Sequence, residues 1–252
     1  MDIDRTSDRP VYKQVADALR AAIRSGELTD GAPLASETEL MDRYGVSRNS
    51  ARNAVALLRV EGLVVTEHGR GTFVRAQRPL RRLSSSRYSK AKRQARRAPL
   101  HAEQGTQSDQ QLGVEVVDPP TEVADRLGLL SDEKALVRRH LLSLGGEPAQ
   151  LADSYFPLSV AQGTRIERDE KIPAGVHAEL EQELGYELDR FVEELTFRMP
   201  SPEEARQLRT GAGVPVVRLL RTLYDTSGRA LEVSEFVLAG DRHVLVYELS
   251  AG

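Results

Sequence analysis

Residues 36–58 read SETELMDRYGVSRNSARNAVALL, and residues 61–74 continue as EGLVVTEHGRGTFV. Ser36 followed three residues later by Glu39 is the pattern of a capping box, which opens a helix, and Gly45 supplies the left-handed residue that ends it. Ser47 is a good cap for a second helix. The stretch therefore predicts two helices joined by a tight turn, as in a helix-turn-helix.

An amphipathic helix is predicted before this stretch. Pro10 suits a first helical turn, apolar residues recur at three- and four-residue steps, and Gly26 ends the pattern. Residues 1–9 are polar and rich in acids, so we expect them to fray. The segment thus begins with a helix that can pack against the next two.

The outer face of the helix that Ser47 opens is polar. Arginine and asparagine side chains offer hydrogen-bond donors to guanine and adenine edges, and the positive helix N-terminus favours phosphates. A solvated face on an ordinary three-helix bundle is the other interpretation of this pattern. The apolar side holds Ala51, Ala54, Val55 and Leu58, and the polar side holds Arg48, Asn49, Ser50, Arg52 and Asn53.

A tight hairpin is predicted after the third helix. Residues 63–67 and 72–74 have the composition of short strands, and His68-Gly69-Arg70-Gly71 joins them. Two glycines allow positive φ and a close approach of the tip to another surface. A basic side chain on such a tip suits a minor groove or a run of phosphates. Three helices followed by this wing favour DNA binding.

Residues 10–74 resemble the DNA-binding domain of GntR-type bacterial transcription regulators. The resemblance rests on LASETEL at 34–40, YGVSR at 44–48, ARNA at 51–54, EGL at 61–63 and GRGTFV at 69–74. It implies a winged helix-turn-helix domain over residues 8–76. Ala35 replaces the family's usual proline, and Thr38 replaces an arginine that touches DNA, so one contact is expected to be lost. The expected DNA-binding residues are Ser36, Ser47, Arg48, Asn49, Ser50, Arg52, Asn53, His68, Gly69, Arg70, Gly71 and Thr72.

Charge is divided unevenly along the chain. The formal net charge of −3 is made up of −1 over residues 1–74, +10 over residues 75–97 and −12 over residues 98–252. We therefore expect residues 77–110 to form a basic linker. It is either a flexible, solvated joint or an added source of salt-dependent affinity for phosphates, and both can hold together.

The rest of the chain predicts an antiparallel sheet, and the protein as a whole belongs to the α+β class. Hairpin-forming glycines and prolines separate runs of alternating apolar residues, and short helical patterns lie between them. We expect this second domain to span residues 111–250. The predicted strands are 112–117, 135–144, 148–156, 188–199, 214–224, 230–239 and 244–249, with helices over 121–127, 176–184 and 201–208.

This second half resembles the UTRA domain of the HutC branch of GntR regulators. The motifs are RMPSPEEA at 198–205, PVV at 215–217, RTLYD at 221–225 and GDR at 240–242. The resemblance implies a sheet related to chorismate lyase, an effector pocket on that sheet and a homodimer formed partly through it. Sugar-phosphate sensors of this branch carry two arginines at the positions of His140 and Leu142, so we expect a less charged effector here.

Charged and aromatic residues on predicted strands are the candidates for effector binding, although such residues are individually more often structural than ligand-binding. No histidine pair has metal-ligand spacing, no nucleophile motif or phosphate-cradling glycine loop is present, and there is no cysteine. We therefore expect no catalytic residue, metal or cofactor. The candidates are Arg139, His140, Tyr155, Glu194, Arg198, Glu232 and Tyr247.

The sequence as a whole predicts an effector-responsive, homodimeric repressor that binds double-stranded DNA. No apolar run approaches the roughly 18 residues of a membrane span, and no signal segment is present, so we expect a cytoplasmic protein without a membrane partner. Two alternatives remain. One is a DNA-binding repressor that ignores metabolites, and the other is an enzyme with an appended DNA-binding domain.

Overall fold

The computed structural model describes residues 3–67, 69–75, 80–83, 107–211 and 213–247. It forms two compact units, one of residues 1–78 with 210–214 and one of residues 79–209 with 215–252. No helix among the described residues is long and apolar enough to cross a membrane.

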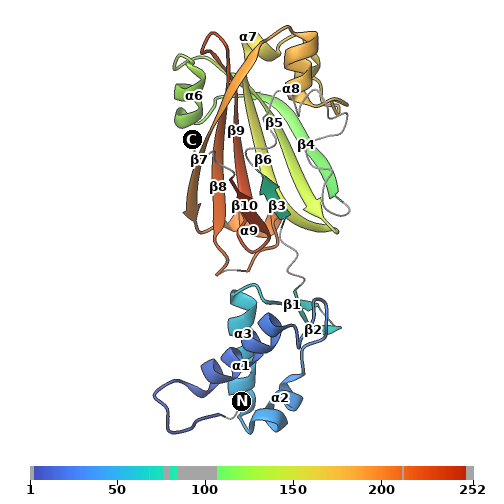
Figure 1. Ribbon diagram of the computed structural model, residues 1–252, viewed down its shortest axis with the longest axis vertical. Coiled ribbons are helices and arrows are strands. Elements are labelled where there is room, and N and C mark those ends of the chain that lie inside the picture. Colours follow the sequence, from blue (N-terminus) through green and yellow to red (C-terminus); the bar gives the residue numbers. More distant parts are fainter. Residues whose placement is uncertain (1–2, 68, 76–79, 84–106, 212, 248–252) are drawn as a thin grey trace. The chain divides into compact units, whose positions relative to one another are not determined.

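The N-terminal unit is a three-helix bundle followed by a hairpin, as the sequence predicts (Figure 1). Ser36 and Glu39 form the predicted capping box, and Gly45 ends the second helix in the left-handed conformation with φ 62°. Ser47 caps the third helix by accepting a hydrogen bond from the Ser50 amide. The elements are α1 (Val11–Ser25), α2 (Glu37–Tyr44), α3 (Arg48–Val60), β1 (Val64–Glu67) and β2 (Gly71–Val74).

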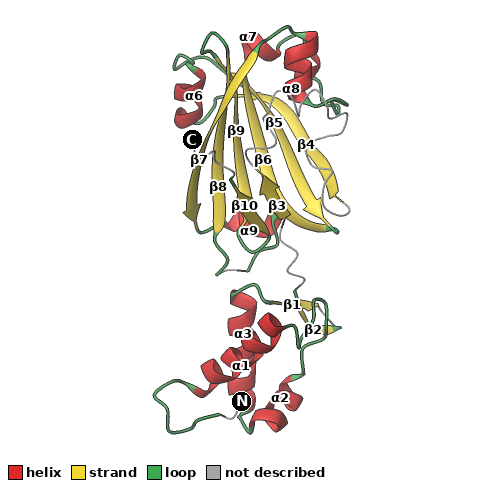
Figure 2. Ribbon diagram, viewed as in Figure 1, coloured by secondary structure: helices red, strands yellow, loops and turns green. Residues whose placement is uncertain are grey.

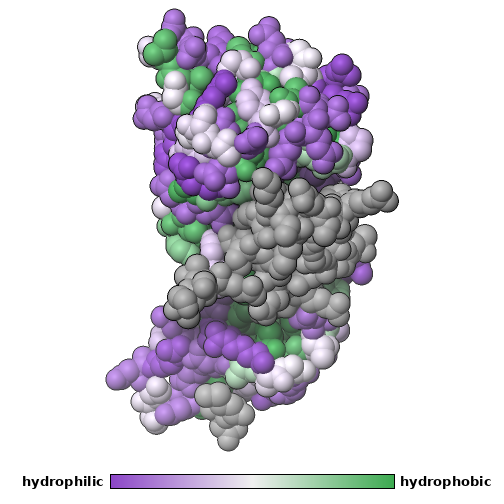
Figure 3. Space-filling view, turned by 45° about the horizontal axis from the view of Figure 1, so that its top comes forward, coloured by the Kyte–Doolittle hydropathy of each residue, from purple (hydrophilic) through white to green (hydrophobic). Residues whose placement is uncertain are grey.

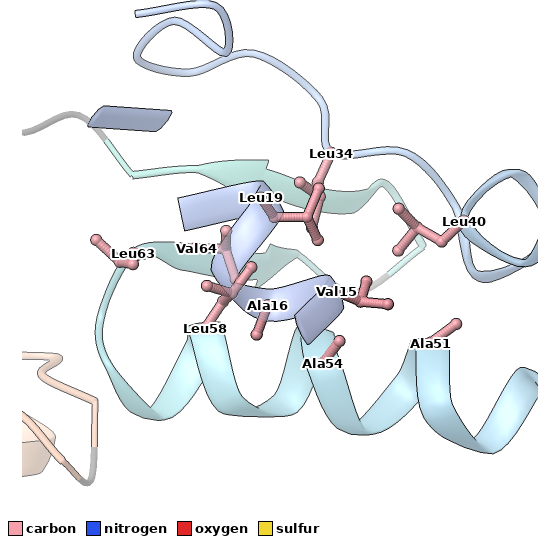
Figure 4. Packing of buried hydrophobic residues seen from close by; sticks show 10 residues of the cluster. All are labelled: Val15, Ala16, Leu19, Leu34, Leu40, Ala51, Ala54, Leu58, Leu63 and Val64. Carbon is pink, nitrogen blue, oxygen red and sulfur yellow. The ribbon is translucent and has the colours of Figure 1, made fainter. Parts of the chain in front are cut away.

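One apolar core joins these elements (Figure 4). Val15 and Leu19 of α1 pack against Ala54 and Leu58 of α3, because both helices place small or branched residues at three- and four-residue steps. Leu40 of α2 is also fully buried. The core fixes the direction of α3, so the polar residues of this helix point away from the bundle.

Residues 3–9 are ordered against the helical bundle, although their polar composition predicts that they fray. Ile3 packs against the bundle core, and the Gln14 side chain hydrogen-bonds to the backbone of Asp4 and Arg9. The expected fraying is therefore wrong for these residues. Composition missed it because a single buried amide on α1 satisfies three backbone groups of the segment.

The C-terminal unit is built on a six-stranded antiparallel sheet with strand order β4-β5-β6-β9-β8-β7 (Figure 2). The four inner strands are the most apolar, and the edge strands β4 and β7 are more exposed. This agrees with the predicted antiparallel α+β class. The strands are β4 (Gln107–Val117), β5 (Ala135–Leu144), β6 (Glu147–Pro157), β7 (Leu188–Arg198), β8 (Val216–Asp225) and β9 (Ala230–Ala239).

Helices cover both faces of this sheet. One face, which we call the α6 face, carries α6 (Thr121–Leu127) and α9 (Pro202–Gln207); the other, the α8 face, carries α7 (Leu158–Ala161) and α8 (Val176–Ala178) (Figure 1). The α8 helix continues as a π-helical turn, Glu179–Glu183, where the sequence predicts an uninterrupted helix. In the space-filling view, the end of the unit that carries α7 and α8 is mostly hydrophilic (Figure 3).

Two features at the domain boundary differ from the expected linker and last strand. Leu80–Leu83 (β3) lies inside the predicted linker and pairs in parallel with His243–Val246 (β10). The last strand therefore joins this small second sheet and not the antiparallel one. β4 also starts at Gln107, earlier than predicted. The boundaries 8–76, 77–110 and 111–250 stay a prediction, and residues 84–106 lie outside the described residues.

Candidate nucleic-acid interface and ligand face

Half of the candidate DNA-binding residues lie at the start of α3, from its cap Ser47 to Asn53. Arg48, Asn49, Arg52 and Asn53 are exposed, while Ala51 on the opposite side is fully buried. Alternation between the two sides follows the helical period, so the exposed group forms one polar surface over the first two turns. The arrangement matches the prediction from sequence.

The serines near this surface have mainly capping contacts. Ser36 accepts a hydrogen bond from the Glu39 amide, and Ser47 accepts one from the Ser50 amide at 3.2 Å. The Ser47 and Ser50 hydroxyls lie 3.0 Å apart. These hydroxyls fix the N-terminus of each helix, which is the end that attracts phosphate oxygens.

Arg52 has a partner that the sequence did not suggest. Its Nε and Nη2 atoms donate to the two carboxylate oxygens of Glu37 on α2, at 3.1 and 3.4 Å. These hydrogen bonds to the Glu37 carboxylate raise the pKa of Arg52 above its ordinary value. The pair links α2 to α3 across the helix-turn-helix and holds the guanidinium in a defined orientation.

The wing forms as predicted between β1 and β2. Gly69 and Gly71 have φ values of 72° and 116°, which residues with a Cβ rarely adopt. The Thr72 hydroxyl lies 3.2 Å from the Thr66 hydroxyl, and the Arg70 guanidinium lies over the Phe73 ring and pairs with Glu67. His68 lies outside the described residues. Arg70 remains largely exposed, with a side-chain exposure of 73%.

Strand register divides the seven effector candidates between the two faces of the large sheet. Residues directly opposite each other share a face, and neighbours along a strand do not. Arg139 pairs with Asp153 in register, and His140 pairs with Ala152, so Arg139 and His140 face opposite ways. The candidates therefore do not line one pocket. Arg139, Tyr155, Glu194 and Arg198 lie on the α6 face, and His140, Glu232 and the hydroxyl of Tyr247 lie on the α8 face.

On the α6 face, the candidate charges are paired with the helices or with neighbouring strands. Glu194 pairs with Arg126 of α6, and Arg198 pairs with Glu204 of α9 at 2.6 Å. Arg139 pairs with Asp153 and with Glu115. A cavity of about 280 Å³ opens on this face. It is lined by Leu112, Arg139, Leu151, Asp153, Glu204, Gln207, Glu235 and Val237.

Burial raises the pKa of two groups on the α6 face. It raises the pKa of the Asp153 carboxyl, and the nearby Arg139 only partly opposes this. Burial, with the charges of Asp153 and Glu235, raises the pKa of Tyr155 to about 12. Tyr155 packs among apolar residues that α6 covers, so its hydroxyl stays neutral at physiological pH.

On the α8 face, a buried polar cluster lies beneath α8. His177 Nε2 is 2.8 Å from Glu232 Oε2, the other Glu232 oxygen accepts from the Ser234 hydroxyl, and Ser234 is 2.7 Å from Ser154. Burial acts to raise the pKa of Glu232, but the charge and hydrogen bond of His177, with Ser234 and Arg221, outweigh it and lower the pKa to about 2. Glu232 is therefore an anion in the folded protein.

Three charged residues of the α8 face were not among the candidates from sequence. Arg221 donates through Nε and Nη2 to Glu193 at 2.9 and 2.8 Å, and both side chains are buried. The Tyr247 hydroxyl donates to the same carboxylate at 3.3 Å. Arg138 is 2% exposed and donates to backbone carbonyls between residues 166 and 170, so it fixes the loop before α8.

The cluster does not have the order of a nucleophilic triad. The Ser234 hydroxyl donates to the Glu232 carboxylate and not to the His177 imidazole, so the order serine, imidazole, carboxylate of such a triad is not formed. Within the described ranges, no group of three or more His, Cys, Asp or Glu side chains is placed to hold a metal ion. The cluster therefore offers hydrogen-bond donors and hydrogen-bond acceptors on this face of the sheet.

Comparison with known proteins accounts for both halves of the chain. The model for bacterial regulatory proteins of the gntR family matches residues 11–74, and the UTRA domain model matches residues 103–244. The chain is 32% identical to the uncharacterized HTH-type transcriptional regulator SCO4628 of Streptomyces coelicolor, over 95% of this chain and 92% of that protein. It is 27% identical to the HTH-type transcriptional repressor NagR of Bacillus subtilis, over 98% of each.

A solved structure has the same fold. PhnF from Mycobacterium smegmatis matches 94% of this chain and 100% of its own, with a TM-score of 0.57 and 23% identity. The match extends over both the helical unit and the sheet. At this identity, the likeness concerns the fold alone.

Proposed function

The chain belongs to the GntR family of bacterial regulatory proteins and carries a UTRA domain, and from this premise we propose that it is a homodimeric repressor of the HutC branch. Its relatives are helix-turn-helix transcription regulators, so DNA-binding regulation is the coarse function. The proposal adds that it binds a palindromic operator and that a small-molecule effector releases it. We place it in the cytoplasm, where the DNA is.

The observation that carries this proposal is the polar start of α3 beside the wing. Four exposed side chains able to read base edges lie in the first two turns, opposite the fully buried Ala51, Ala54 and Leu58. In helix-turn-helix proteins, the N-terminal residues of the recognition helix contact bases, while caps and loops contact phosphates. Each protomer thus reads one half-site, and two-fold symmetry requires inverted half-sites about one helical turn apart.

Arg52 is the residue expected to contribute most to sequence readout. An arginine in this position can donate two hydrogen bonds to guanine. The Arg52→Ala variant should lose its preference for the operator, a loss of roughly tenfold to a hundredfold, while its fold and dimer stay intact. The measurement is a mobility shift with operator DNA selected by the wild type, beside circular dichroism and gel filtration.

Arg59→Ala is the matched control. Arg59 is exposed on the same helix two turns further on, so its removal changes net charge equally without touching the first turns. It should retain preference for the operator. Equal behaviour of the two variants would count against the assignment of the reading surface.

We place the effector site on the α8 face. His140 and Leu142 occupy the positions at which sugar-phosphate sensors of the branch carry arginines, and strand alternation sets both on the face that holds Glu232. His177 on α8 contacts Glu232 from above the sheet. Binding beneath α8 would favour one of two dimer arrangements, provided the effector has different affinities for them.

The surroundings of His140 favour an effector without a phosphate. Asp109 lies 3.1 Å from His140 Nδ1, and Leu142 is buried. The Asp109 carboxylate, beside His140, would repel a phosphate. Leu142 has no hydrogen-bond donor to offer it. Calorimetry that detects micromolar binding of a hexose phosphate would overturn this part of the proposal.

We further propose that the second domain has no catalytic activity. The cluster of Ser234, Glu232 and His177 supports this, because Ser234 donates to a carboxylate whose pKa is about 2, and so weak a base does not activate a serine hydroxyl. An enzyme would show turnover that Glu232→Gln abolishes. A repressor that ignores metabolites remains the closer alternative, and a ligand screen separates it from the proposal.

A further inference from the structure

The N-terminal arm, residues 3–9, has a defined conformation on the DNA-binding unit. Gln14 of α1 is buried; its Oε1 accepts from the Asp4 amide at 2.8 Å, and its Nε2 donates to the carbonyls of Asp4 and Arg9 at 2.8 and 2.9 Å. The Asp4 carboxylate accepts from the Thr6 hydroxyl and amide, which lowers the pKa of Asp4. Both ends of the arm are thereby fixed.

This conformation brings Arg5 to the turn of the helix-turn-helix. Arg5 Nη2 donates to the Gly45 carbonyl at 2.8 Å. Gly45 is the left-handed residue between α2 and α3, and a Cβ built on it would lie 3.6 Å from the same nitrogen. The carbonyl uses one of several N–H donors on the guanidinium, and Arg5 is exposed.

The turn at Gly45 lies next to the start of α3, the proposed recognition helix. Ser47, the cap of α3, follows Gly45 by two residues. When the start of a recognition helix enters the major groove, phosphates pass beside its first residues and the turn before them. The unit has no excess of basic residues, because residues 1–74 carry 10 Lys and Arg against 11 Asp and Glu. A cation at this turn therefore adds to the few positive charges that the unit can offer to DNA phosphates.

The second arginine of the arm is placed differently. Arg9 Nη2 pairs with Asp17 of α1 at 2.6 Å, and Asp17 also pairs with Arg20. The charge of Arg9 is thus neutralised within the protein. Arg5 and Arg9 lie on the same short arm and have the same side chain, but Arg9 is paired with a carboxylate and Arg5 donates to a carbonyl. Arg9 is therefore a matched control.

We propose that Arg5 is a DNA-backbone contact, in which its guanidinium binds a phosphate beside the half-site that α3 reads. The arm is then a third DNA-binding element beside the helix and the wing. The contact rests on the proposed function, since it requires the same docking of α3. It recognises phosphate and not sequence, so it should act on any duplex.

The test is the salt dependence of DNA binding by the full-length protein. Fluorescence anisotropy measures Kd from low to moderate salt for two labelled duplexes, one selected by the wild type and one scrambled. For each protomer bound, Arg5→Ala should reduce the slope of log K against log salt by about 0.9. It should weaken binding of both duplexes by the same factor, roughly threefold to tenfold near physiological salt. Arg9→Ala should keep the wild-type slope.

A second variant separates the phosphate contact from a structural role. Arg5→Gln keeps an N–H donor for the Gly45 carbonyl but removes the charge, and it should lose the same slope as Arg5→Ala. Variants that lower the melting temperature while the slope stays at the wild-type value would overturn the proposal. If Arg52→Ala loses its preference for the selected duplex while Arg5 variants keep the slope, only the arm contact fails. If the wild type itself does not distinguish the two duplexes, both the proposed function and the arm contact fail.

Discussion

At the scale of the residue, the pair of Arg52 and Glu37 places an acid on the surface that is to approach phosphates. Both side chains are largely exposed, with exposed fractions of 63% and 40%. Exposed ion pairs contribute little to folding stability. An acid here also repels DNA, so stability does not account for its position. We propose instead that Glu37 orients the Arg52 fork toward a base edge, since it contacts both Nε and Nη2.

Glu37→Gln should therefore separate affinity from specificity. Removing one negative charge should tighten binding to scrambled DNA, while the loss of orientation should reduce the preference for operator over scrambled DNA by roughly fivefold to tenfold. Anisotropy on both duplexes measures the ratio. Asp42→Asn, an equal charge change at an exposed position of the same helix, is the control. If both variants change the ratio alike, Glu37 does not position Arg52.

At the scale of the element, the contact of α8 with β9 depends on ionised Glu232. The folded pKa of this carboxyl is about 2, below the ordinary value of 4.5, because His177 and its other partners outweigh the effect of burial. A group whose pKa is depressed by folding stabilises the protein above its unfolded pKa. The stabilisation is lost as pH falls toward the folded pKa.

The free energy of unfolding should accordingly fall between about pH 4.5 and pH 2, by an amount on the order of 3 kcal/mol from this group. In Glu232→Gln this part of the pH dependence should be absent. Urea unfolding of both proteins at several pH values measures it. Glu194→Gln, at a carboxylate on the α6 face that is 54% exposed, should leave the profile nearly unchanged. A wild-type profile in Glu232→Gln would contradict this account of the cluster.

Local signals explain which elements were predictable. The capping boxes at Ser36 and Ser201 are complete within four residues, and both helices start where the boxes predict. The hairpin of β5 and β6 follows from Gly145-Gly146 between two apolar runs. The parallel pairing of β3 with β10 joins opposite ends of the second domain, and no local pattern indicates such a partner.

The candidate sites divide in the same way. The polar face of α3 follows from helical period alone, whereas Glu37 reaches Arg52 only through the packing of α2 on α3. For the effector candidates, strand alternation already sets Arg139 and His140 on opposite faces. That signal could have divided the set from the sequence. The buried pair of Arg221 and Glu193 needed the register of β7 and β8.

At the scale of the whole molecule, the proposed response to a metabolite depends on the second domain. A ligand that binds the folded state alone stabilises it by about 2.7 kcal/mol at one hundred times its Kd. We expect a neutral or weakly charged metabolite to raise the melting temperature of the full-length protein. Screening hexoses against their 6-phosphates is a matched comparison, and the phosphates should have no effect. Stabilisation by the phosphates alone would contradict the proposed effector class.

A screen without any stabilising ligand would favour the repressor that ignores metabolites. Glu232→Gln gives the site-specific control. The variant should lose the shift in melting temperature caused by a ligand beneath α8. If the shift persists, the ligand binds elsewhere, and the cavity on the α6 face that Arg139 and Asp153 line becomes the alternative site.

We propose that two copies of this chain read an inverted repeat through α3. Selection of duplexes from a random pool by the full-length protein, followed by sequencing, tests it most directly. We predict enrichment of two inverted half-sites with centres about 10 base pairs apart, and loss of that enrichment in Arg52→Ala. A single unrepeated site, no enriched sequence, or the same repeat selected by Arg52→Ala would contradict it.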